Sequence, residues 1–131
     1  MGCRRTGIVL AMCLAAGGSA KAHHSLTVFE PLKQIELDGV VKEFKFIAPH
    51  TMIILEVRGK DGEPVSWSLE GFSPSDLARD GWSRTSLKQG DKIKVTIQPL
   101  RSGTSGGLWV AKWVRFRDGT PIVPTFERNE E

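Results

Sequence analysis

The sequence predicts an all-β domain, a five-stranded OB-like barrel with one short helix between the third and fourth strands. Apolar residues alternate with a period of two along most of the chain, which is typical of strands. Helix signals occur at one place only. A long bent first strand, a tight hairpin and a helix before the fourth strand follow the order of an OB-like barrel. A flatter β-sandwich is the main alternative.

Residues 33–46 are expected to form one long first strand whose apolar pattern changes phase. One parity holds Ile35, Leu37 and Val41, and the opposite parity holds Val40, Phe44 and Phe46. The change falls near Gly39, and a glycine eases the backbone through a β-bulge or a sharp bend. We therefore expect a bulge or a barrel corner near Gly39.

A hairpin follows the first strand. Residues 52–58 place alternate apolar side chains on one face, and the pair Asp61-Gly62 supplies a tight turn. The returning strand continues the alternation with Val65, Trp67 and Leu69.

The one helix signal starts at Ser73, which can cap a helix. Pro74 suits the first helical position, Asp76 lies near the positive end of the helix dipole, and Gly81 ends the helix. In an OB-like barrel this helix closes one end, and the expected plug residues are Leu77 and Trp82.

Two more strands complete the barrel. After Gly90-Asp91 the fourth strand alternates Ile93, Val95 and Ile97 with polar residues. Residues 107–117 form the fifth strand, which carries apolar side chains on both parities and is therefore expected to be covered on both sides.

The first 22 residues read as a secretory signal peptide. Arg4 and Arg5 precede a short apolar stretch at 8–16, and Ala20-Lys21-Ala22 is a small-residue cleavage site. Cleavage after Ala22 would leave a periplasmic or secreted protein, with residues 23–131 as a single domain and 120–131 as a partly flexible tail. Lipidation at Cys13 and twin-arginine export are the alternatives.

Removal of that leader changes the composition. The full chain has 18 basic and 15 acidic residues, and the leader takes away three basic residues and no acidic one. Both cysteines, Cys3 and Cys13, also go, which excludes disulfides and thiol ligands from the mature domain. The balanced charge gives no argument for nucleic acid as a partner, and Lys92, Lys94, Lys112, Arg115 and Arg117 are expected to lie on solvated strand faces.

Cleavage before His23 would create a chelating terminus. The α-amine and imidazole of His23 and the imidazole of His24 are nitrogen donors suited to copper(II) or zinc, and His50 is the one further histidine of the chain. The sequence thus predicts a transition-metal site at His23, His24 and His50. The alternative is that the first two are ordinary terminal residues and His50 is a polar loop residue.

A second hypothesis is a binding face for a peptide, an oligosaccharide or a partner protein. OB-like folds bind extended ligands across their second and third strands. The candidate contacts are Ser66, Ser68 and Glu70, together with an aromatic platform of Trp109 and Trp113. Core packing, or cover by residues 121–126, is the alternative for the two tryptophans.

No nucleophile and base pattern surrounds Ser25, Ser68 or Thr85, so the sequence favours a binding protein over an enzyme.

Several motifs together resemble a family of small exported bacterial proteins of unknown function. They are His23-His24-Ser25, Pro49-His50, Asp61-Gly62, Trp67, Gly81-Trp82-Ser83-Arg84 and Leu87-Lys88-Gln89-Gly90-Asp91. The resemblance runs along nearly the whole mature chain and implies an exported OB-like domain without an assigned activity. Members often carry Asn-Pro-His where this chain has Ala48-Pro49-His50.

Overall fold

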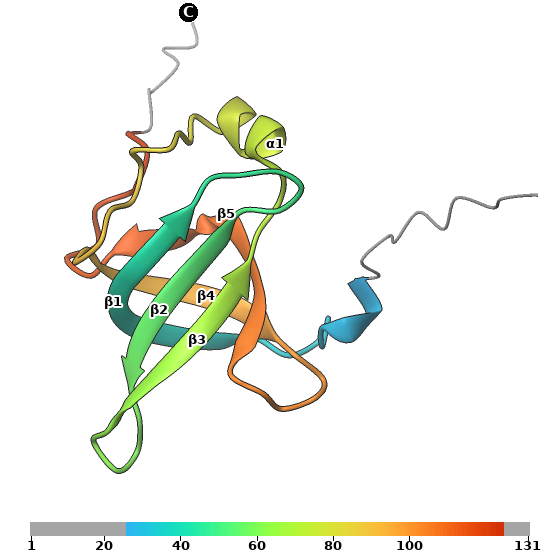
Figure 1. Ribbon diagram of the computed structural model, residues 1–131, viewed down its shortest axis with the longest axis vertical. Coiled ribbons are helices and arrows are strands. Elements are labelled where there is room, and N and C mark those ends of the chain that lie inside the picture. The colour runs from blue at the N-terminus through green and yellow to red at the C-terminus, as the bar shows by residue number, and fades with distance from the viewer. Residues whose placement is uncertain (1–25, 125–131) are drawn as a thin grey trace, which may run out of the picture.

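A computed structural model describes residues 26–124. They form the closed five-stranded barrel that the sequence predicts, with its strands in the order β1-β2-β3-β5-β4 (Figure 1). The elements are η1 (Leu26–Val28), β1 (Ile35–Lys45), β2 (Met52–Arg58), β3 (Pro64–Glu70), α1 (Pro74–Arg79), β4 (Lys92–Pro99) and β5 (Gly106–Phe116). All neighbouring strands are antiparallel except β3 and β5, which are parallel.

The first strand serves both sides of the barrel. The first half of β1 pairs with β4 and its second half with β2, and Gly39 is in register with both. A Cβ atom at Gly39 would lie 2.5 Å from the carbonyl oxygen of Glu56, so only glycine permits this close approach. The bulge itself lies between Val41 and Glu43, a few residues beyond the expected position.

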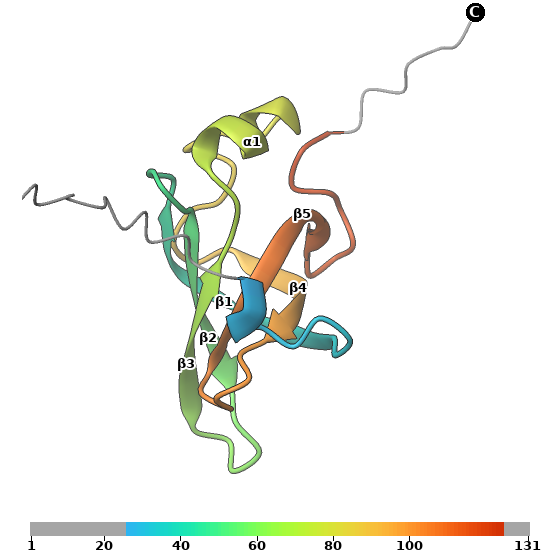
Figure 2. The same ribbon diagram turned by 90° about the vertical axis from the view of Figure 1, so that its right-hand side faces the viewer.

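The predicted hairpin and helix are both present. β2 and β3 pair along their full lengths, from Met52 opposite Glu70 to Arg58 opposite Pro64. Ser73 caps α1 by accepting a hydrogen bond from the backbone N–H of Asp76, and Pro74 begins the helix. Figures 1 and 2 both show α1 above one end of the barrel, and the predicted plug residues Leu77 and Trp82 are buried in the core.

The fifth strand contains a large bulge that the sequence analysis did not predict. Val95 pairs with Val114 and Ile97 with Trp109, so four residues of β5, from 110 to 113, bulge out between two pairs that are adjacent on the same face of β4. Trp109 and Val114 both point inward, although they have opposite parity. A bulge of this size changes the direction of the strand. Of the four bulged residues Lys112 is exposed and the other three are half-buried.

Trp109 is the largest fully buried side chain of the barrel core. Its side chain is completely buried and lies 5.1 Å from Trp82 between ring centroids. A Cβ atom at Gly71 would come within 2.5 Å of Trp109 Cε2 and 2.6 Å of Thr51 Oγ1. The indole is thus in direct contact with the backbone that follows β3.

We predict that Gly71→Ala lowers the free energy of unfolding by about 3 kcal/mol, because the new methyl group overpacks this contact. Chemical denaturation measures the loss. The matched control is Gly62→Ala, where a Cβ meets nothing within 4 Å but φ is +86°, and the expected loss is about 1 kcal/mol. Equal losses in the two variants would contradict the packing argument.

Candidate functional site

His50 lies in the loop between β1 and β2, and one of its neighbours is a carboxylate on β3. Its Nδ1 atom is 3.3 Å from Oε1 of Glu70, and both side chains are about one-third exposed. The pairing of Met52 with Glu70 at the ends of β2 and β3 brings the two residues together. The other predicted metal ligands, His23 and His24, lie outside the described residues. Within residues 26–124 there is no cluster of three or more His, Cys, Asp or Glu side chains that could hold a metal ion.

The segment before β1 is attached to the loop between β4 and β5. Phe29 is buried and pairs with Leu100, and the backbone N–H of Arg101 donates to the carbonyl of Val28. The guanidinium of Arg101 donates from Nε to the carbonyl of Thr27 at 2.7 Å and lies 3.3 Å from Oε1 of Glu30. These contacts fix the path by which the chain enters the barrel.

The predicted binding face on β3 exists as a geometric unit. Ser66 and Ser68 are exposed and Glu70 is half-buried, and all three point away from the core. Their register partners on β2 are Glu56, Ile54 and Met52, in that order. Trp67, on the opposite parity, packs against the core.

Phe72 lies just beyond the end of β3. After the last register pair, Met52 with Glu70, the N–H of Gly71 donates to the carbonyl of Thr51 and the N–H of Thr51 donates to the carbonyl of Phe72, so Gly71 and Phe72 both lie opposite Thr51. The side chain of Phe72 is 42% exposed, and Ile47 in the preceding loop is 52% exposed. Sequence reasoning missed Phe72, although an apolar residue at the same parity as the polar positions of β3 was a usable signal.

The two predicted platform tryptophans have different surroundings. Trp109 is completely buried, as expected if it packs in the core. The two tryptophans therefore cannot form an exposed platform together. Its indole N–H has no hydrogen-bond acceptor among the described residues. Trp113 is half-buried, and the ammonium of Lys112 lies 5.9 Å from its ring centroid.

Two of the predicted surface cations, Arg115 in β5 and Arg117 just after it, pair with acidic residues of β1. Arg115 Nη2 lies 2.8 Å from Oε2 of Glu36, and Arg117 Nη2 lies 2.6 Å from Oδ1 of Asp38. Both pairs reach across β4 on the outer surface of the barrel.

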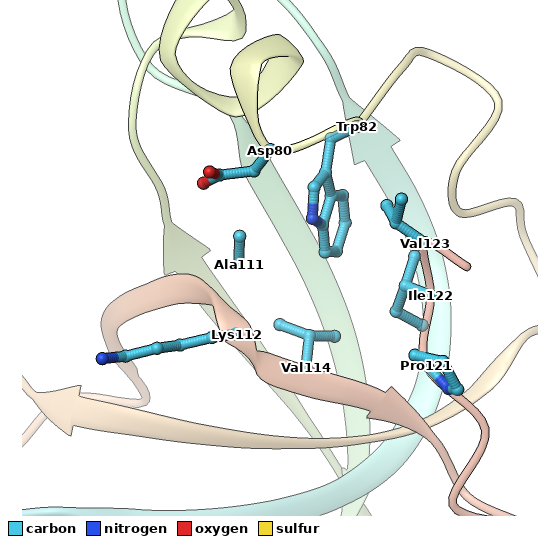
Figure 3. A pocket seen from close by; sticks show the side chains of 8 residues that line it. All are labelled: Asp80, Trp82, Ala111, Lys112, Val114, Pro121, Ile122 and Val123. Atoms are coloured by element: carbon cyan, nitrogen blue, oxygen red, sulfur yellow. The ribbon is translucent and has the colours of Figure 1, made fainter. Parts of the chain in front are cut away.

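A pocket of about 490 Å³ opens beside the bulge of β5 (Figure 3). It is bounded by the end of α1, by the bulge, and by the segment that follows β5; the lining residues are Asp80, Trp82, Ala111, Lys112, Val114, Pro121, Ile122 and Val123. Figure 3 shows the indole nitrogen of Trp82 on the side of the ring that faces Asp80 and Ala111. The sequence did not reveal this pocket, because the bulge that creates it interrupts the alternation.

A comparison with known protein families matches residues 11–111 to the family of unknown function DUF6152. The chain belongs to this family. Membership confirms the resemblance to a family without an assigned activity, and it leaves export and the terminal His-His-Ser as predictions. No curated protein matches the chain.

Two crystal forms of Rim1, a mitochondrial single-stranded DNA-binding protein of S. cerevisiae, are similar in structure to this DUF6152 member. The first has 11% sequence identity and a TM-score of 0.46, and covers 65% of this chain and 93% of its own. The second has 8% identity and a TM-score of 0.47, and covers 65% and 92%. The barrel assignment rests on the strand order of this chain itself. In residues 26–124 there is no helix of the length and apolarity needed to cross a membrane.

A turn at Asp118 leads the chain from β5 to the pocket wall. Hydrogen bonds from the hydroxyl and the backbone N–H of Thr120 to Oδ1 of Asp118 lower the pKa of that carboxyl. We predict that Thr120→Val raises the pKa of Asp118 towards its ordinary value, because the hydroxyl makes the largest contribution. Carboxyl NMR titration measures the change.

The sign of the pH effect follows from the lowered pKa. The turn is stabilised above the unfolded-state pKa of Asp118, and this contribution is lost as the pH falls through the lower folded-state value. Thr104→Val is the control, since Thr104 bonds to Ser102 and not to a carboxylate. An unchanged Asp118 pKa in Thr120→Val would contradict the assignment.

Proposed function

We propose that this protein is exported and binds a copper(II) or zinc ion through the α-amine and imidazole of His23, with His24 and His50 completing the donor set. The observation that carries the proposal is the contact between His50 Nδ1 and Glu70. Metal-binding histidines commonly have one ring nitrogen held by a carboxylate, which fixes the ring and makes the other nitrogen a stronger donor. In this arrangement Nε2 of His50 binds the metal.

In the proposed site His23 has to reach His50, and the attachment point of the N-terminal segment supports this reach. Phe29 pairs with Leu100, Leu100 bonds to Gly106, and Gly106 pairs with Ser68. Three strand spacings of about 4.8 Å therefore separate Phe29 from β3. Because residues 26–28 form η1, with a rise of about 2 Å per residue, the six residues from His23 to Phe29 can span at most about 16 Å. That span covers the distance to β3, the strand that ends at Glu70.

The acidic partner also favours a cation at this position. Glu70 is half-buried at the end of β3, and bound metal adds positive charge beside its carboxylate. Because Glu70 contacts Nδ1 of His50, we expect Glu70 to orient the imidazole ring, and we expect the ring itself to be the metal ligand.

We predict that protein beginning at His23 binds Cu(II) or Zn(II) with micromolar or tighter affinity in calorimetry, and that His50→Ala abolishes most of this heat. Glu70→Gln is expected to weaken binding by about 10- to 100-fold, because the ring is held less firmly and its donor nitrogen is less basic. The matched control is the same protein, beginning at His23, with its α-amine acetylated, which keeps all three imidazoles but removes the amine as a donor. Equal heats in the two proteins would refute chelation by the terminal amine.

Cleavage of the signal peptide before His23 can be tested separately. Intact mass and elemental analysis of protein taken from the exported fraction report the first residue and any bound metal together. A first residue other than His23 would contradict the proposed chelate.

The outer face of β2 and β3 supports a second candidate function, binding of an extended ligand such as a peptide or an oligosaccharide. The supporting observation is the exposed ring of Phe72, two residues after Glu70 at the end of the strand that carries Ser66 and Ser68. An aromatic anchor next to hydroxyl and carboxylate groups is typical of such surfaces.

We predict that a ligand of this kind shifts the backbone amide signals of residues 66–72 in NMR titrations with maltohexaose and with a hexapeptide mixture. Phe72→Ala is expected to weaken the binding at least about tenfold, because aromatic anchors carry much of the energy of an interface. Leu32→Ala is the control, since Leu32 is 99% exposed and lies outside this face. Shifts that survive Phe72→Ala unchanged would exclude the face as the binding site.

A further inference from the structure

The pocket beside the β5 bulge is separate from the residues of the proposed metal site. Its walls are mainly apolar, and the three most buried contributors are Trp82 (4% exposed), Val114 (6%) and Ile122 (9%). A volume of about 490 Å³ and apolar walls with few polar groups are properties of small-molecule sites.

Backbone contacts hold the outer wall of this pocket in place. Pro121 pairs with Arg115, and the N–H of Phe116 donates to the carbonyl of Thr120. The segment also packs tightly against the end of α1, because a Cβ atom at Gly81 would lie 2.8 Å from Val123 Cγ1. The pocket is therefore part of the folded barrel and needs no ligand to form its walls.

The lining carries one carboxylate, that of Asp80, and one ammonium, that of Lys112, and both side chains are exposed. The carboxylate of Asp80 forms no ion pair with any residue in the described range 26–124, and it stands at the C-terminal end of α1, where the helix carbonyls add negative potential. Figure 3 shows Lys112 extending away from Trp82, and its ammonium lies near the ring of Trp113.

The indole of Trp82 adds a second group suited to a cation. Figure 3 shows its ring beside Asp80 and above Val114, with the carboxylate of Asp80 directed away from the ring. An aromatic ring and a carboxylate on an apolar wall are the features that proteins use to bind ammonium groups attached to apolar bodies. Negatively charged molecules would meet the carboxylate and be disfavoured.

We propose that this pocket binds a small organic cation, a protonated amine on an apolar body of up to one aromatic ring. The ammonium contacts the carboxylate of Asp80, and the apolar body lies between Trp82, Val114 and Ile122.

The test is a calorimetric titration of the full mature chain, treated with EDTA so that the result is independent of the proposed metal site. The probes are phenethylammonium, the neutral phenethyl alcohol and the anionic 3-phenylpropionate. We expect the cation to bind about tenfold more tightly than the neutral probe, and the anion to bind least, because only the cation gains a charged hydrogen bond at Asp80.

Two variants locate the binding. Asp80→Asn is expected to remove the preference for the cation, whereas the matched control Glu63→Gln, which removes an exposed carboxylate elsewhere, keeps it. Ala111→Leu fills the pocket and is expected to abolish binding of both the cation and the neutral probe. Retained far-ultraviolet dichroism and thermal midpoint establish that each variant is folded.

Three results would overturn the proposal. The first is equal or tighter binding of the neutral or anionic probe. The second is a cation preference that survives Asp80→Asn. The third is cation binding that appears only after residues 125–131 are deleted, since the occupant in the full chain is then its own C-terminal segment.

Discussion

The packing of Trp109 against the backbone at Gly71 is the constraint on which much of this barrel depends. A completely buried indole in a barrel this small leaves no room for a side chain at Gly71, and the ring then supports Trp82 and the end of α1. Because Trp109 is at one end of the β5 bulge, the same contact fixes where that strand leaves regular pairing. The position of the bulge in turn decides where a pocket can open.

The barrel gathers its candidate binding features in two places. Closure between β3 and β5 places the N-terminal segment, through Leu100 and Gly106, three strand spacings from the strand that carries Glu70. The end of α1 and the chain after β5 meet over the bulge and form the apolar pocket. The first place offers nitrogen and oxygen donors, and the second offers an aromatic wall with a carboxylate, so the two suit ligands of different chemistry.

Local patterns predicted the strands, the helix and its plug residues, because alternation and capping depend on neighbouring residues. The predicted position of the first bulge was less accurate. Gly39 is required for the close approach of Glu56, and the bulge lies a few residues further along the strand. The outward orientation of Ser66, Ser68 and Glu70 was predictable from the alternation along the hairpin. The contact of Glu70 with His50 was not, because it depends on how the loop after β1 returns to the sheet.

The sequence by itself determined the fold class, since a period of two, one capped helix and the order of the turns admit few topologies. It also limited the imidazole ligands of the proposed metal site to three histidines. Only the tertiary structure decided that Trp109 is core and that Trp82, Asp80 and Ile122 share a pocket. Such contacts join residues far apart in the chain, and a bulge that reverses side-chain parity cannot be located without the partner strand.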